Sequence, residues 1–246
     1  MADGNPCFPD FALLDPITCI SDLRNGTTAW ALTTAGLTIQ VSLAAAAPPR
    51  LSHFCVCCPG CDKTTFDDAP DVFCAAGDHA LIRVGFTASE STEHFIYRAR
   101  GPDGRPSLDL LPDFDDYSDA ESLLLPYGFV SHRKKHLVIA ALSDGPRPTD
   151  WEYYLHTRST EPHSTWSKKL LRVEFPRGAA RKSAMNDPVK VIALGGGLLG
   201  WVNLMEGILI CDVLDPGVAA LRFVPMPKLL SSNNQLYDNE SREGDS

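Results

Sequence analysis

Short runs of β-branched, aliphatic and aromatic residues recur along the whole chain, and Gly, Pro, Asp and Asn separate them. No long segment has the apolar period of 3.6 residues that marks an amphipathic helix. Many short strands with turn residues between them are typical of antiparallel sandwiches, barrels and propellers. The sequence therefore predicts an all-β fold, with strands at 29–33, 37–43, 51–57, 72–75, 80–86, 94–98, 107–111, 129–132, 136–142, 152–157, 167–174, 189–194, 198–204, 208–214 and 219–225.

Two of these runs have different apolar patterns. In 37–43 the apolar residues alternate with Thr38, Gln40 and Ser42, which predicts an antiparallel strand with one buried face. The run 137–142 is apolar throughout. It suits a strand that is covered on both faces, although periodicity alone also allows a short buried helix.

Length and charge limit the classes of function. A chain of 246 residues with 44% hydrophobic side chains can bury one large β domain or two smaller ones. Its formal charge of −9 opposes attraction to nucleic acid or anionic lipid, because both need a positive field. The sequence has neither a signal-peptide pattern nor an apolar run long enough to span a membrane.

The distribution of residues predicts three regions and one cellular environment. We expect a flexible N-terminus at 1–7, a β-rich domain at 8–230 and a disordered polar tail at 231–246. The eight cysteines include an adjacent pair and several isolated residues, in a chain much larger than typical disulfide scaffolds. Reduced thiols and a cytoplasmic or nuclear location follow as predictions.

One segment concentrates soft metal ligands. His53 and the four cysteines Cys55, Cys57, Cys58 and Cys61 lie within nine residues. Thiolates this close could share a metal ion, and Cys58-Pro-Gly-Cys61 has redox C-x-x-C spacing. However, His53, Cys55 and Cys57 alternate like one face of a strand, and a free cysteine packs as a small hydrophobe. We therefore predict strand cysteines and no metal site, with a metal or redox site at these four cysteines as the alternative.

The glycine run 195–200 matches the dinucleotide fingerprint G-x-G-x-x-G. That function requires the glycines to open a helix, whereas residues 201–214 read as two short strands around a turn at 206–207. We predict a glycine-rich β-turn. The chain also has no G-x-S-x-G, no H-E-x-x-H and no P-loop. The predictions are therefore no enzymatic activity, no cofactor and no small-molecule substrate.

Several segments resemble one plant family. They are Phe8-Pro-Asp-Phe-Ala-Leu-Leu-Asp-Pro16, the stretch 195–215 with 221–227, and, in the middle, 47–60 and 107–112. Together they are similar to the family, abundant in grasses, that carries the domain of unknown function 1618 (DUF1618). In that family the named domain begins near 195–230 and continues further, so the chain resembles a C-terminally shortened member. It has Asn203 where an aspartate is common.

The resemblance implies a fold and adds to the prediction of function. The implied fold is a partial β-propeller of four-stranded antiparallel blades with no established catalysis, and the strand pattern leaves a two-sheet β-sandwich as the alternative. The many short strands, the lack of an active-site motif and the family kinship together predict a non-catalytic protein–protein interaction module, related to stress or defence, with an unknown protein partner. A truncated paralogue with little independent function is a further alternative. The family-motif hairpin comprises Gly200, Trp201, Asn203, Gly207, Cys211 and Asp212.

Overall fold

A computed structural model describes residues 11–89, 91–101, 103–112, 127–132, 136–146, 151–161, 163–177 and 190–227. These residues form β-strands and one 3-10 turn, η1 (Lys63–Thr65), without any α-helix. The all-β prediction is therefore confirmed. The regions expected to be flexible, 1–7 and 231–246, lie outside the described residues.

The chain forms two compact units, Met1–Ser143 with Leu155–Lys168 and Asp144–Tyr154 with Lys169–Ser246. The β-rich region expected at 8–230 thus contains two units. Each is described by itself below. No helix among the described residues has the length and apolarity needed to cross a membrane.

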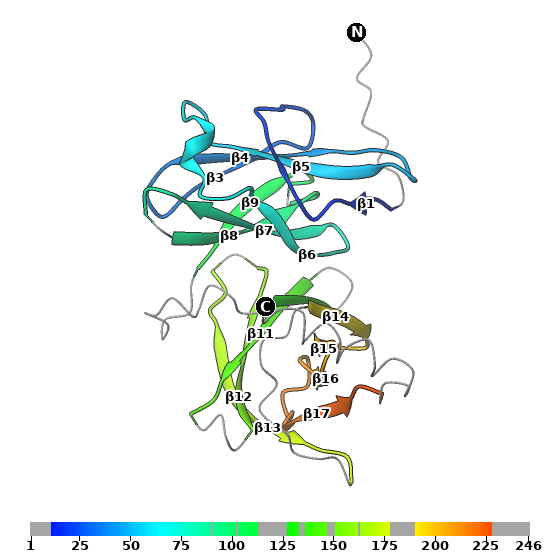
Figure 1. The fold of residues 1–246 in the computed structure, drawn as a ribbon. Helices are drawn as coiled ribbons and strands as arrows, with labels where there is room; N and C mark the ends of the chain where they lie inside the picture. Colours follow the sequence, from blue (N-terminus) through cyan, green and yellow to red (C-terminus); the bar gives the residue numbers. More distant parts are fainter. Residues whose placement is uncertain are drawn as a thin grey trace, which may run out of the picture. The chain divides into compact units, whose positions relative to one another are not determined.

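The first unit contains two facing sheets (Figure 1). In one sheet the strand order is β1 (Leu13–Leu14), β5 (Leu51–Cys57), β4 (Thr38–Ala44) and β3 (Ala29–Leu32), and the short β2 (Cys19–Ile20) also pairs with β5. The other sheet is an antiparallel meander of β6 (Asp71–Ala76), β7 (His79–Phe86), β8 (Ser91–Arg98) and β9 (Ser107–Leu111).

The two sheets curl toward each other at their edges. Isolated bridges join Ile17 to Asp71 and Phe66 to Phe86, and β3 lies beside β9. This gives the first unit a barrel-like form. The meander has the order of one propeller blade, and face-to-face packing is common to a sandwich and to neighbouring blades. The propeller itself therefore stays a prediction.

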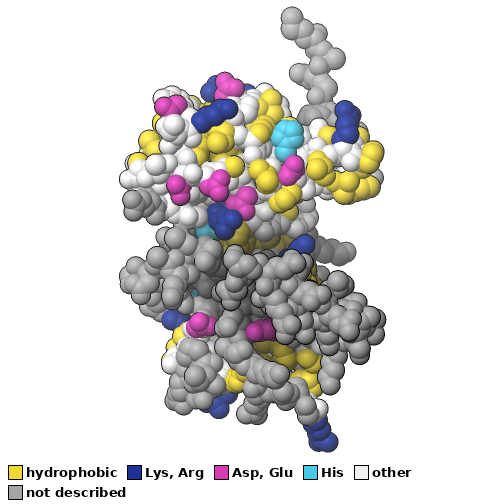
Figure 2. Space-filling view, in the orientation of Figure 1, with side chains coloured by type: hydrophobic (Ala, Val, Ile, Leu, Met, Phe, Trp, Pro, Cys, Tyr) yellow, Lys and Arg dark blue, Asp and Glu magenta, His cyan; other side chains and the backbone are white. Residues whose placement is uncertain are grey.

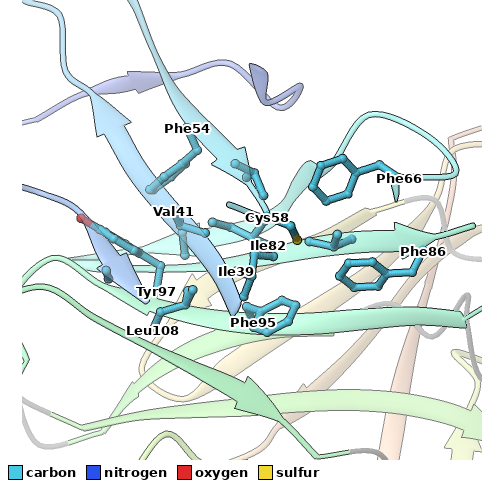
Figure 3. Close-up of a cluster of buried hydrophobic side chains, with 14 residues drawn as sticks. Ile39, Val41, Phe54, Cys58, Phe66, Ile82, Phe86, Phe95, Tyr97 and Leu108 are labelled. Carbon is cyan, nitrogen blue, oxygen red and sulfur yellow. The ribbon is translucent and has the colours of Figure 1, made fainter. Parts of the chain in front are cut away.

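Apolar side chains from both sheets fill the space between them (Figure 3). Ile39 and Val41 point inward from β4, as their alternation predicts, and are fully buried. The polar residues Gln40 and Ser42 are buried as well, whereas Thr38 at the start of the strand is exposed. Gln40 Nε2 and Ser42 Oγ donate hydrogen bonds to the backbone oxygen of Leu23, at 2.8 and 2.7 Å. The prediction that only one face of this strand is buried is therefore wrong at Gln40 and Ser42, because an earlier segment of the chain covers them.

The first unit continues with the hairpin of β10 (Tyr127–His132) and β11 (His136–Asp144). The apolar run 137–142 lies within β11, so it is a strand and not a helix. Ile139, Ala140 and Ala141 are fully buried, which confirms that both faces of this strand are covered. Ile139 and Ala141 pack with Leu81 and Ile96 from the meander.

The second unit is built on five strands in the order β13, β17, β16, β15 and β14. Their bounds are β13 (Ser167–Glu174), β14 (Lys190–Gly195), β15 (Leu198–Asn203), β16 (Gly207–Asp212) and β17 (Ala220–Pro225), and β12 (Glu152–Ser159) has residues in both units. β13 and β17 are parallel, whereas β14 to β17 are antiparallel. Leu199, Trp201, Leu209 and Leu221 are buried in this unit.

Candidate functional site

The outward face of β5 carries most of the predicted soft ligands. Phe54 and Val56 belong to the core between the sheets. Because successive strand residues point to opposite faces, His53, Cys55 and Cys57 lie on the outer face, as predicted. The outer face of β5 is therefore the first place to look for chemistry.

Two short strands extend this face along the edge of β5. β1 and β2 both run parallel to β5, with Leu13 opposite Leu51 and Cys19 opposite Cys55. Leu14 and Ile20 pack against the core. Leu13 and Cys19 therefore point outward beside Leu51 and Cys55.

This register creates a thiol–imidazole cluster of Cys19, His53 and Cys55. One ligand atom from each lies within 4.8 Å of the others, and among the described residues this is the one group of three potential metal ligands so close together. The two Sγ atoms are 2.6 Å apart. Cys55 is buried, whereas Cys19 and His53 are half-buried, so the cluster is reachable from solvent.

The other candidate cysteines are placed differently. Cys57 is half-buried, and burial raises the pKa of its thiol. Cys58 points into the core, where burial raises its pKa to about 11. Cys61 is exposed, and its N–H donates to the backbone oxygen of Cys58 at 3.0 Å, which closes the Cys-Pro-Gly-Cys turn. The structure thus groups Cys55 with Cys19 and His53, and not with the cysteines that follow it.

The raised pKa values of the buried thiols argue against a redox role for these cysteines. Burial first, and then the neighbouring Cys19, raise the pKa of Cys55 to about 12. Thiols that act in exchange reactions have a lowered pKa, because the thiolate is the nucleophile. The environment of Cys55 and Cys58 is therefore that of thiols with low reactivity.

The same face carries two exposed apolar side chains. Leu13 and Leu51, which are paired across β1 and β5, are 42% and 53% exposed. Phe11, two residues before Leu13 in the chain, is 66% exposed, and we call these three residues the β1–β5 apolar patch. Figure 2 shows hydrophobic side chains gathered at the end of the first unit that carries β1 and the turn between β4 and β5. A gathering of this kind on one face marks a contact surface more often than scattered apolar residues do.

The residues predicted to form a hairpin at 200–212 do so, as β15 and β16 joined by a short turn. Asn203 Oδ1 accepts a hydrogen bond from the N–H of Met205 at 2.8 Å. A Cβ atom at Gly207 would lie 2.4 Å from the backbone oxygen of Val224, so only glycine fits there. The other residues of this hairpin also have packing or hydrogen-bonding positions. Gly200 lies close to Ile208, and Trp201 and Cys211 are buried. Asp212 Oδ1 accepts a hydrogen bond from the N–H of Leu214.

The glycine run before this hairpin is a turn between strands. Gly195, Gly196 and Gly197 have φ angles of 84°, 61° and 96°, which glycine adopts readily. β15 follows directly, so these glycines do not open a helix. The β-turn prediction is confirmed, and the geometry that a dinucleotide pyrophosphate needs is absent from this segment.

The described structure therefore contains two features on one outer face, the thiol–imidazole cluster and the β1–β5 apolar patch. The sequence pattern indicated His53 and Cys55, but it did not indicate Cys19 or Leu13, because two-residue strands leave no periodic signal, nor Phe11, which lies outside the strands. Comparisons with protein-family models, with curated proteins and with solved structures find no match to this chain.

Proposed function

We propose that this protein is a non-catalytic protein-interaction module and that the β1–β5 apolar patch is part of its contact surface. The observation that carries the proposal is the exposure of Leu13 and Leu51, which are paired on one face, together with that of Phe11 two residues earlier in the chain. An apolar patch in water costs solvation free energy, which a partner's apolar surface would recover.

The backbone beneath the patch is fixed by hydrogen bonds. Leu13 and Leu51 are paired in parallel register, and the N–H of Asp15 donates to the backbone oxygen of Ser52 at 2.9 Å. The side chain of Asp15 accepts from the N–H of Ile17 at 3.0 Å. Because the strands already hold these positions, binding would order little additional backbone, which favours affinity.

The patch also indicates the chemistry of the partner. Leucine and phenylalanine side chains fill apolar pockets and offer no hydrogen bonds, so the partner should present an apolar groove. The net charge of −9 gives no field that would attract a polyanion. A protein surface is therefore the proposed target.

The remaining parts of the functional prediction rest on the resemblance to the DUF1618 family. Membership of that plant family, a role in stress or defence, and a cytoplasmic or nuclear location are proposals of the same kind. An interaction module is consistent with each of them. None of them is needed for the patch to act as a contact surface.

Affinity purification with a double variant tests the proposal. We expect the wild-type protein to retain a specific partner, and Leu13→Ser with Leu51→Ser to reduce its recovery at least about ten-fold, which is the loss of about 1.4 kcal/mol from a contact centre. Both side chains are exposed, so the melting temperature should stay within about 2 °C of wild type.

Leu32→Ser is the matched control. Leu32 is 62% exposed on β3, at the opposite edge of the same sheet. It should leave partner recovery unchanged. Equal recovery with the double variant and with wild type, or an equal loss with Leu32→Ser, would contradict the proposed surface.

A further inference from the structure

We infer that Cys19, His53 and Cys55 form a binding site for one Zn²⁺ ion on the outer face of the first unit. The ligand set differs from the four-cysteine set that the sequence suggested, because it combines β2 with β5. The inference is independent of the proposed interaction surface, although both lie on the same face.

Two separate stretches of chain bring the ligands together. His53 and Cys55 are two residues apart on one strand, so their side chains leave the same face. Cys19 comes from 36 residues away, and its parallel pairing with Cys55 places the two side chains side by side. Ligand atoms from all three residues already lie within 4.8 Å of one another.

The donor atoms select the class of metal. Two thiolate sulfurs and an imidazole nitrogen are ligands that Zn²⁺ prefers, whereas Mg²⁺ and Ca²⁺ require oxygen. Three protein ligands with a fourth position open to water is a known Zn²⁺ arrangement. Cys19 and His53 are half-buried, so an ion and one water molecule can reach the site.

The two sulfur atoms must move apart for Zn²⁺ to bind between them. Two thiolates bound to one tetrahedral Zn²⁺, each at about 2.3 Å, lie about 3.8 Å apart. The Sγ atoms of Cys19 and Cys55 are 2.6 Å apart. Directly paired strands are about 4.8 Å apart, so a modest rotation of the half-buried Cys19 side chain would open this distance without moving the backbone.

The competing product at this position is a Cys19–Cys55 disulfide. The distance of about 4.8 Å between paired strands also permits this disulfide, because disulfides join Cα atoms that are about 4.4–6.8 Å apart. A disulfide, however, makes no use of an imidazole. The proximity of His53 to both sulfurs favours the metal, and the disulfide becomes one outcome of the test.

Metal titration of the reduced full-length protein tests the site. We expect one equivalent of Zn²⁺ to bind, and Co²⁺ used as a probe to give thiolate-to-metal charge-transfer absorption. Cys19→Ser and His53→Ala should each weaken Zn²⁺ binding about 100-fold, because a ligand is lost. Both positions are half-buried, so these variants should fold even if Cys55→Ser does not.

Cys61→Ser is the matched control, because this cysteine is exposed and lies outside the cluster. It should bind Zn²⁺ as wild type does. The inference would be overturned by an absence of stoichiometric Zn²⁺, or by a Cys61→Ser loss as large as that of Cys19→Ser. A Cys19–Cys55 disulfide whose reduction leaves no Zn²⁺ affinity would overturn it as well.

Discussion

Phe95→Ala should lower the free energy of unfolding by about 3–5 kcal/mol, the cost of removing a buried aromatic ring and leaving a cavity. Phe95 is fully buried in the core between the two sheets of the first unit (Figure 3). β8 and its neighbours hold it by strand pairing on both sides, so the backbone cannot collapse far into the space. Urea unfolding followed by circular dichroism measures the change.

Phe11→Ala is the matched control for this truncation. Phe11 is 66% exposed, so the same substitution should change the free energy of unfolding by less than about 0.5 kcal/mol. Equal effects at the two positions would show that the sheets do not enclose Phe95. The comparison therefore tests the face-to-face arrangement of the first unit.

Acidification should destabilise the protein through His94. Burial first, and then the charge of Arg83, lower the pKa of His94 from its ordinary value of 6.5 to about 4. Its ring packs against Phe73 and Tyr127, and among the described residues its buried Nε2 has no hydrogen-bond partner. The folded protein therefore holds this imidazole neutral where an unfolded chain would protonate it.

The sign of the effect follows from this lowered pKa. The contribution of the neutral His94 to the free energy of unfolding is complete above pH 6.5. It is lost as the pH falls from 6.5 toward 4, because the histidine of the unfolded chain takes up a proton at a higher pH than that of the folded protein. Over that range wild type should lose about 3 kcal/mol of unfolding free energy relative to His94→Phe, which keeps the aromatic contacts and removes the titration. Unfolding curves of the two proteins at several pH values measure the difference.

Leu32→Ser, at an exposed position without a titrating side chain, provides the control for this pH series. It should follow the wild-type dependence on pH. A His94→Phe protein whose stability falls in parallel with wild type would show that His94 is protonated or solvated in the folded state.

Much of the fold could be predicted because strands of four or more residues leave a readable pattern. The alternation at 37–43 and the apolar run 137–142 both correspond to strands, and Ile39, Val41 and Ile139 are buried as expected. The positive φ angles of the glycine run likewise follow from residue type. Local chemistry decides these features, so local sequence reveals them.

The features that were missed depend on contacts between distant segments. Gln40 is buried because the backbone oxygen of Leu23 accepts its hydrogen bond, and nothing within 37–43 indicates that cover. Cys19 reaches Cys55 only through the register of β2 on β5. A two-residue strand has no period, so sequence reasoning placed His53 and Cys55 on one face but could not supply their third neighbour.

The outer face along β1 and β5 is the surface proposed to contact another protein. Photo-crosslinking in cells that express the full chain can detect this contact, with a benzophenone amino acid placed at Leu51 or, for comparison, at Leu32. We expect a discrete covalent adduct from position 51 that is lost with Leu13→Ser and is absent from position 32. No adduct from position 51, or the same adducts from both positions, would contradict it.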